Sequence, residues 1–200
     1  MFRNLSFTHE SFSHTYPISL FIKEQCGGWS SSKRILCLGD KEGSHALFLA
    51  QNGIHVEVLE LSNEGVFDIY KHASPHCIDM KLCHTTLEHW KPTPFFDGIV
   101  CTFVHVSKKE QQHLFEKCCE ALYPGGILVA ELFSESQKSF QSGGPKELEK
   151  LYNLNQTLHM LKTLPFSIDK FSQEIIPYGK EEAPRAKASV LHIVATKTTS

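Results

Sequence analysis

The stretch RILCLGDKEGSHALFLAQNGIHVEVLELS, residues 34–62, joins two apolar runs through a tight acidic loop and an amphipathic segment. Ile35–Leu38 and Val56–Leu61 are short and mostly aliphatic, as expected of strands that are buried on both faces of a sheet. Between them, Ser44–Gln51 has apolar residues at helical spacing and ends at Asn52-Gly53, a typical helix C-cap. The stretch therefore predicts a strand, a helix and a second strand that pairs in parallel with the first.

The same alternation continues through the middle of the chain. Two more apolar runs, Ile99–Val104 and Ile127–Leu132, lie on either side of a helical pattern at Lys108–Leu122, which Pro124-Gly125-Gly126 ends. A weaker strand is expected at Met80–His84. Strands that alternate with helices predict an α/β fold with a right-handed, doubly wound parallel sheet.

The last third of the chain has a different pattern. Pro145–Leu161 predicts a helix with proline in its first turn. Phe166–Ile176 and Ala188–Thr196 follow as strand-like runs, joined by the polar loop PYGKEEAPRAK with no helix between them. Two strands joined in this way must pair antiparallel, so the sheet is expected to end in a hairpin.

Length and composition indicate one ordinary globular domain. The chain has 200 residues, of which 41% are hydrophobic and 21% charged, and a formal net charge of −2. This charge gives no reason to expect nucleic acid or an anionic membrane as a partner. No apolar run approaches the roughly 20 residues of a membrane span, and the N-terminal residues lack the apolar core of a signal peptide. We therefore expect a cytoplasmic protein, and the sequence does not indicate its oligomeric state.

The seven cysteines and twelve histidines predict neither disulfides nor a metal site. Cys37, Cys83 and Cys101 lie in strand-like runs, where a free thiol behaves as a small apolar side chain. Histidine and cysteine crowd one segment without the paired C-x2-C spacing of structural zinc sites. That segment contains His72, His76, Cys77, Cys83, His84 and His89.

The loop at residues 39–44 excludes the common phosphate-binding motifs. A dinucleotide fingerprint starting at Gly39 needs glycine at positions 41 and 44, where this chain has Lys41 and Ser44. A cofactor without phosphates needs only a sharp turn, which Gly39 and Gly43 can provide, and an acceptor for ribose hydroxyls, which Glu60 can provide. A tight turn in some other α/β protein remains the alternative.

Five segments resemble class I S-adenosylmethionine-dependent methyltransferases. Residues 34–62 resemble motif I and the ribose-binding acid of that family, and FFDGIVCTFVHV, residues 95–106, resembles its fourth-strand motif. ALYPGGILVAELF, residues 121–133, is similar to the turn and fifth strand. QKSFQSGGPKELEKLYNL, residues 137–154, resembles a segment of tellurite-resistance-type small-molecule methyltransferases, and YPISLFIKE, residues 16–24, resembles the N-terminal cap of that group.

The resemblance implies a Rossmann-like sheet of seven strands with an antiparallel C-terminal hairpin. It implies a single methyltransferase domain over residues 1–200, with a cap segment at 1–30, a cofactor-binding half at 33–135, and a substrate-side helix and hairpin at 136–200. The implied cofactor is S-adenosyl-L-methionine, and the implied reaction is methyl transfer to a small-molecule acceptor such as a thiol or a chalcogen compound. Neither nucleic acid nor a membrane is implied as a partner.

The resemblance also implies site residues. In the catalytic region it points to His105, after the fourth strand, and to Arg185, in the hairpin loop, for which a solvated loop charge is the alternative. The residues implied to bind the cofactor come from the first loop and from the ends of the next strands. They are Gly39, Asp40, Lys41, Gly43, Glu60, Leu61, His84, Thr85 and Phe103.

The chain departs from the family pattern at two places. Lys41 replaces the middle glycine, either under backbone strain of about 1–2 kcal/mol or with its cation facing the carboxylate of the cofactor. The aspartate that usually follows the third strand is absent, and His84-Thr85 stand there. These departures suggest a rival hypothesis, a module of the same fold that binds the cofactor without turnover. A nicotinamide-dependent reductase is disfavoured because the dinucleotide fingerprint fails.

Overall fold

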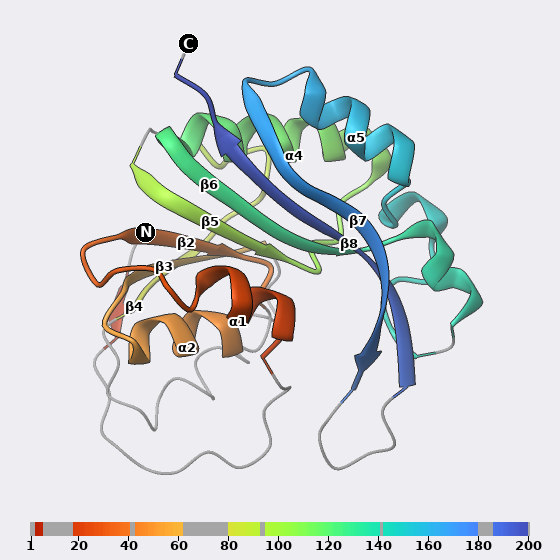
Figure 1. Cartoon of the computed structure of the whole chain (residues 1–200), viewed down its shortest axis with the longest axis horizontal. Coiled ribbons are helices and arrows are strands. Elements are labelled where there is room, and N and C mark those ends of the chain that lie inside the picture. The colour runs from red at the N-terminus through yellow and green to blue at the C-terminus, as the bar shows by residue number, and fades with distance from the viewer. Residues whose placement is uncertain are drawn as a thin grey trace.

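The protein is described here by a computed structural model that covers residues 3–5, 18–40, 43–61, 80–92, 95–140, 142–179 and 186–199. Its strands form one mixed sheet in the order β1-β4-β3-β2-β5-β6-β8-β7 (Figure 1). The strands are β1 (Arg3–Leu5), β2 (Arg34–Leu38), β3 (His55–Glu60), β4 (Met80–His84), β5 (Phe96–Thr102), β6 (Leu122–Phe133), β7 (Phe166–Tyr178) and β8 (Ala186–Lys197). The helices are α1 (Leu20–Cys26), α2 (Ser44–Gln51), α4 (Lys108–Ala121) and α5 (Leu154–Lys162), with short 3-10 helices at Glu135–Ser139 and Leu148–Lys150.

The predicted fold class is confirmed. Strands β4, β3, β2, β5 and β6 pair in parallel, β8 pairs antiparallel with β6, and β7 pairs antiparallel with β8. All seven predicted strands are present within a few residues of their expected bounds. An eighth strand, β1, pairs antiparallel with β4 over three residues. A segment of three residues is too short to carry an alternating pattern, so the sequence did not reveal it.

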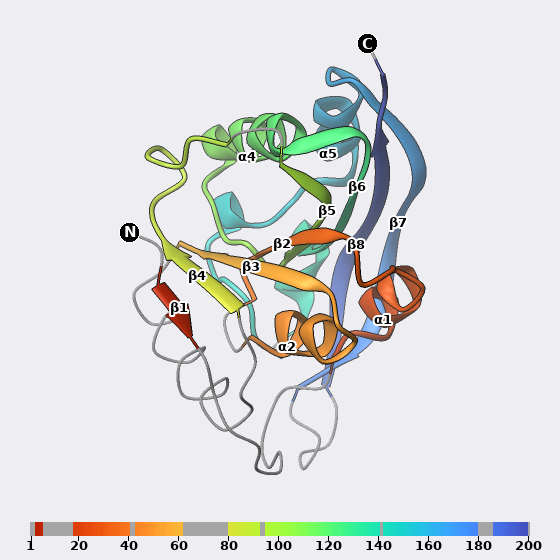
Figure 2. The same ribbon diagram turned by 90° about the vertical axis from the view of Figure 1, so that its left-hand side faces the viewer.

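Helices cover both faces of the sheet. Helices α4 and α5 lie on one face, and α1 and α2 lie on the other (Figures 1 and 2). Neighbouring side chains of β5 point to opposite faces of the sheet. Val100 packs in the core beneath α1 and α2, and Cys101 packs in the core beneath α4 and α5. Successive side chains of a strand point to opposite faces, so a strand covered on both sides must be apolar throughout. This explains the continuous apolar runs.

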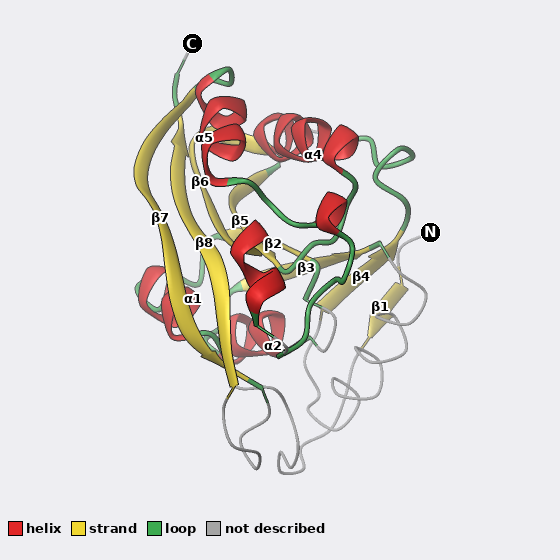
Figure 3. Ribbon diagram, turned by 90° about the vertical axis from the view of Figure 1, so that its right-hand side faces the viewer, coloured by secondary structure: helices red, strands yellow, loops and turns green. Residues whose placement is uncertain are grey.

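The prediction of one helix over Pro145–Leu161 is wrong. The helix α5 begins only at Leu154 (Figure 3). The side chain of Asn153 caps it by accepting a hydrogen bond from the backbone N–H of Gln156 (3.1 Å). Before it, the backbone N–H of Tyr152 donates to the carbonyl of Phe133 (2.9 Å), and its buried hydroxyl donates to the carbonyl of Val104 (3.0 Å). These bonds, to the end of β6 and to the loop after β5, hold the chain extended, so tertiary contacts override local helical propensity.

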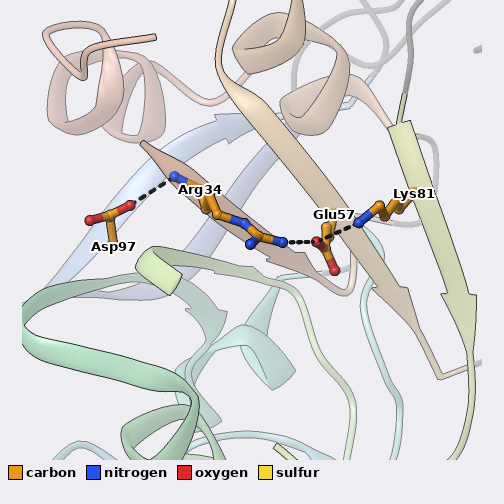
Figure 4. Close-up of polar contacts among 4 residues, drawn as sticks. All are labelled: Arg34, Glu57, Lys81 and Asp97. Carbon is orange, nitrogen blue, oxygen red and sulfur yellow. Dashed lines mark hydrogen bonds and ion pairs between the residues drawn. The ribbon is translucent and has the colours of Figure 1, made fainter. Parts of the chain in front are cut away.

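Polar contacts link the strands toward their amino ends (Figure 4). Asp97, at the start of β5, accepts a hydrogen bond from the backbone N–H of Arg34 in β2 (2.9 Å). The guanidinium of Arg34 pairs with Glu57 of β3 (2.8 Å), and Lys81 of β4 approaches the same carboxylate (3.4 Å). These contacts connect β2, β3, β4 and β5 near the amino ends of the strands.

Candidate functional site

A cavity of about 1180 Å³ opens at the carboxyl ends of the parallel strands. It is lined by residues that follow β2, β3 and β5, by the end of β6, and by parts of α1 and β7. Strand β2 lies between β3 and β5, which is the point where the order of the sheet reverses. Ligands of doubly wound sheets bind at such a reversal.

The loop after β2 is shaped by a glycine. Gly39 has a φ of +74°, and a Cβ atom there would lie 2.4 Å from the carbonyl oxygen of Thr102 and 2.4 Å from a methyl group of Val104. No other residue fits without moving β2 away from β5. Gly43 also has a positive φ (+73°) and precedes α2, but it is not among the residues that line the cavity.

Asp40 and His45 tie this loop to α2. The buried carboxylate of Asp40 accepts the backbone N–H of Ala46 (2.7 Å) and contacts Nδ1 of His45 (3.0 Å), while Nε2 of His45 accepts the backbone N–H of Ser19 (3.4 Å). Burial alone would lower the pKa of His45. The charge and hydrogen bond of Asp40, together with the charge of Glu131, outweigh that effect and raise it. Both oxygens of Asp40 are thus engaged within the protein, although the residue lines the cavity.

The end of β3 brings two of the predicted residues to the cavity. Glu60, 4% exposed, and the half-buried Leu61 both line it. Thr85 donates its backbone N–H to the carbonyl of Glu60 (3.2 Å), so the end of β4 is close by. His84 and Thr85 themselves are not among the lining residues. The structure thus brings Glu60 and Leu61 together with the first loop, and their role in binding a cofactor stays a prediction.

The chain beyond β5 contributes to an aromatic wall. We use this name for Phe103, His105, Phe133 and Tyr178, which all line the cavity. The ring centroid of Phe133 lies 4.6 Å from that of Phe103, 5.3 Å from that of Tyr178 and 5.8 Å from that of His105. Phe103 has a φ of +49°, which a residue other than glycine adopts at a cost of about 1–2 kcal/mol. Such strain is often found at functional sites.

The glycine pair of residues 143 and 144 packs against this wall. A Cβ atom at Gly144 would lie 3.0 Å from the ring of Phe133, and one at Gly143 would lie 3.1 Å from the ring of Tyr178. Both glycines have a positive φ, of +79° and +121° respectively. The G-G-P-K segment therefore serves to let the backbone approach the aromatic rings closely.

Sequence reasoning missed a buried polar cluster at the same cavity. Glu131 of β6, 1% exposed, accepts a hydrogen bond from the hydroxyl of Ser19 (2.7 Å) and pairs with Nε2 of His192 in β8 (2.8 Å). The ring of His192 stacks on Phe21 of α1, with centroids 4.0 Å apart and an angle of 6° between the planes. Glu131 lies in an apolar run that reads as an ordinary strand, and only the fold brings its partners to it.

Three buried oxygen atoms at the cavity have no hydrogen-bond partner among the residues that the structure describes. They are Oγ of Ser44, Oγ1 of Thr102 and Oε1 of Glu131. Buried polar atoms are nearly always satisfied in folded proteins, by protein, water or ligand. The residues that carry them all line the cavity, so these atoms are candidate partners for a polar ligand.

Other predicted residues lie outside the described part of the chain or away from the cavity. Lys41, Arg185 and the histidines and cysteine at 72–77 are outside the described residues. Within the described ranges, no three histidine, cysteine or acidic side chains are placed to hold a metal ion, and no helix is long and apolar enough to cross a membrane. The cysteines of the described ranges are free thiols, and burial raises the pKa of Cys101 to about 12.

Comparison with known proteins gives a consistent result. Residues 35–126 match a family model described as a methyltransferase domain, and no curated protein matches the sequence. A SAM-dependent methyltransferase from Methanosarcina mazei has a similar structure, with a TM-score of 0.68 and 17% identity over 88% of this chain and 98% of that one. TehB from Haemophilus influenzae gives a TM-score of 0.72 and 14% identity over 90% of this chain and 63% of that one.

A third similar structure was described for the conversion of a disulfide bond into a thioacetal group during echinomycin biosynthesis. It gives a TM-score of 0.71 and 14% identity over 92% of this chain and 81% of that one. At these identities the similarity of the three structures concerns the fold.

Proposed function

We propose that this chain, which has the domain and the fold of class I S-adenosylmethionine-dependent methyltransferases, transfers a methyl group from that cofactor to a small-molecule thiol or chalcogen compound. The cofactor is the one that the domain and the fold indicate. The observation that carries the acceptor proposal is the position of the aromatic wall, which lines the same cavity as Glu60 and the first loop.

The residues at the carboxyl ends of β2, β3 and β5 fit S-adenosylmethionine. The carboxylate of Glu60, at the end of β3, can accept hydrogen bonds from ribose hydroxyls, and Leu61 offers an apolar surface for adenine. The hydroxyls of Ser44 and Thr102 lack a partner in the described part of the protein, which suits a ligand rich in polar atoms. When bound, the cofactor supplies a methyl group on a sulfonium centre.

The size of the cavity leaves room for an acceptor. Sites for one drug-sized ligand occupy roughly 300–1,000 Å³, and this cavity is larger, at about 1180 Å³. Divalent sulfur makes favourable contacts with aromatic ring edges at about 5 Å, and the aromatic wall offers such edges. The neighbour described for converting a disulfide bond into a thioacetal group supports a sulfur-containing acceptor.

The chemistry we propose is direct transfer in one step. The protein holds the acceptor in line with the methyl group and excludes water, which by itself can lower a barrier substantially. A covalent intermediate on Cys37 or Cys101 is disfavoured, since both are fully buried in the sheet and burial raises the pKa of both thiols. His105 belongs to the aromatic wall and shapes the acceptor pocket.

We further propose that residues 1–200 form a single domain with the cap, cofactor-binding and substrate-side parts set out above. The position of α1 supports this division, because Ile18–Phe21 and β7 both line the cavity that the cofactor half opens. We also propose a cytoplasmic location and small molecules, rather than nucleic acid or membrane, as the binding partners.

The proposal is tested by a methyl-transfer assay with S-adenosylmethionine, small alkyl and aryl thiols, and selenium and tellurium oxyanions under reducing conditions. We expect methylated sulfur or chalcogen products together with stoichiometric S-adenosylhomocysteine. Cofactor binding without methylation of any of these acceptors would contradict the acceptor class and favour the module without turnover.

Replacing His105 with alanine is expected to lower kcat/KM for a thiol by about tenfold, less than the 10²–10⁴-fold that a general base contributes. The reason is that His105 shapes the acceptor pocket in this proposal and does not take the proton. The measurement is the rate of thiol methylation, with the affinity for S-adenosylhomocysteine determined alongside. A loss beyond about 10²-fold, with cofactor affinity intact, would identify His105 as the base.

A further inference from the structure

Glu131 is the middle one of three cavity-lining residues that lie side by side in the sheet. Thr102, Glu131 and His192 are paired neighbours across β5, β6 and β8, and all three line the cavity. The backbone carbonyl of Glu131 also accepts the N–H of Phe103 (2.8 Å), the first residue of the aromatic wall. Glu131 is therefore directly beside the acceptor end of the cavity.

The two oxygens of this carboxylate differ in their surroundings. Oε2 is held by the hydroxyl of Ser19 (2.7 Å) and by Nε2 of His192 (2.8 Å). Stacking on Phe21 in turn fixes the ring of His192. Oε1 is buried and has no partner among the described residues. Glu131 lines the cavity, so a carboxylate with one oxygen held and the other buried without a partner among the described residues can accept a hydrogen bond or a proton from a ligand that reaches it.

We propose that Glu131 is the base of the reaction, and that Oε1 takes the proton of the acceptor thiol while Ser19 and His192 position the carboxylate. This inference rests on the proposed function. As the S–H bond breaks, its proton passes to Oε1 and its electron pair stays on the acceptor sulfur. That sulfur forms the bond to the methyl carbon, and the electron pair of the broken carbon–sulfur bond remains with the cofactor. The negative carboxylate and the positive sulfonium are both neutralised, so charge balances.

The surroundings of Glu131 are consistent with a carboxylate that serves chemistry. Burial of an ionisable group is costly unless it is paired, and here one of its two buried oxygens has no partner among the described residues. Charged and titratable groups of α1, the first loop, α2, β7 and β8 line the same cavity as Glu131. They are Lys23 and Glu24 of α1, Asp40 and His45 at the first loop and α2, Lys170 of β7 and His192 of β8.

The test compares two thiols that differ in pKa. An alkyl thiol with a pKa near 8.5–9 is mostly protonated at neutral pH, whereas an aryl thiol of low pKa is already a thiolate and needs no base. In Glu131→Gln, which keeps the size of the side chain and one acceptor oxygen but removes the base, we expect kcat/KM for the alkyl thiol to fall about 10²–10³-fold. The value for the aryl thiol should fall less than about fivefold, because no proton transfer is lost.

The pH dependence gives a second readout. In Glu131→Gln only preformed alkyl thiolate reacts, so the rate should rise about tenfold per pH unit up to the pKa of the thiol itself. The wild-type rate should depend on pH less steeply in this range. As a matched control, Glu174→Gln removes an exposed carboxylate from the same cavity. We expect it to change kcat/KM for the two thiols by the same factor.

Calorimetry with S-adenosylhomocysteine separates the acceptor from the cofactor. We expect Glu131→Gln to bind it within about threefold of wild type, since the carboxylate serves the acceptor. A large loss of this affinity would show that Oε1 holds the amino group of the cofactor, and would overturn the inference. An equal fall in kcat/KM for both thiols in Glu131→Gln would also overturn the inference. Failure of wild type to methylate either thiol would overturn the proposed acceptor class and this inference with it.

A second variant covers the case in which Glu131→Gln fails to fold. Ser19→Ala removes one of the two donors to Oε2 from the edge of the cavity and leaves the carboxylate in place. We expect kcat/KM for the alkyl thiol to fall about five- to tenfold and kcat/KM for the aryl thiol to stay unchanged. Equal changes for the two thiols would contradict a positioning role for Ser19 and the assignment of Glu131 as the base.

Discussion

Gly39→Ala is expected to lower the free energy of unfolding by about 2–5 kcal/mol. A non-glycine residue at a φ of +74° costs about 1–2 kcal/mol. The added Cβ atom would also lie 2.4 Å from the backbone carbonyl of Thr102, which is part of β5 and cannot turn aside. Overpacking of this kind costs typically 1–3 kcal/mol. Urea denaturation measures the change.

Gly53→Ala is the matched control for this substitution. Gly53 has nearly the same φ, of +78°, but a Cβ atom there would meet nothing closer than Cβ of Ser31 at 3.5 Å. We therefore expect only the backbone cost, about 1–2 kcal/mol. If the two variants lose the same stability, the close approach of β2 and β5 at Gly39 does not constrain the loop as the structure implies.

Glu60→Ala is expected to weaken the affinity for S-adenosylhomocysteine about 10- to 100-fold. Hydrogen bonds to a charged group contribute about 1.5–3 kcal/mol, and 1.4 kcal/mol corresponds to a factor of ten in the dissociation constant. Glu60 is 4% exposed and lines the cavity at the end of β3, where the ribose of a nucleoside cofactor is expected. Isothermal titration calorimetry measures the dissociation constant directly.

Glu57→Gln provides the control on the same strand. Glu57 lies three residues before Glu60 and pairs with Arg34 and Lys81, away from the cavity (Figure 4). We expect its removal to leave the affinity for S-adenosylhomocysteine within about twofold of wild type. A similar loss of affinity in both variants would mean that Glu60 acts through the stability of β3 and not through the ribose.

The sheet could be predicted from sequence because its strands are buried on both faces. Ile35–Leu38 is a continuous apolar run and Ile127–Leu132 is apolar except for Glu131, and the structure covers both with helices on each side. The two strands at the C-terminus could be assigned as an antiparallel hairpin because no helix separates them. These features depend on local pattern, which a single sequence contains.

The helix boundary at Leu154 and the polar cluster around Glu131 could not be predicted in this way. Tyr152 is held extended by bonds to the end of β6 and to Val104 in the loop after β5, and these tertiary contacts leave no local signal. The hydroxyl of Ser19 lies 112 residues from Glu131 in sequence, and His192 lies 61 residues from it. No motif spacing connects three residues that only the folded sheet brings together.

The predicted cofactor residues are divided by the structure into three groups. Gly39, Asp40, Glu60, Leu61 and Phe103 line the cavity, as expected for residues at strand ends on either side of the reversal of strand order. Gly43, before α2, and His84 and Thr85, at the end of β4, are close to these strand ends in sequence but do not line the cavity. Lys41 lies outside the described residues, so its two interpretations, strain or contact with the carboxylate of the cofactor, stay predictions.

Calorimetric titration of the wild-type protein with S-adenosylhomocysteine, with NADH in parallel, tests the central claim most directly. We expect S-adenosylhomocysteine to bind with a dissociation constant of about 1–100 µM and NADH to give no binding heat. At a hundredfold excess over that constant the native state gains about 2.7 kcal/mol, so Tm should rise by about 5–10 °C. No heat and no change in Tm at millimolar S-adenosylhomocysteine would contradict the assignment of this cavity to the cofactor.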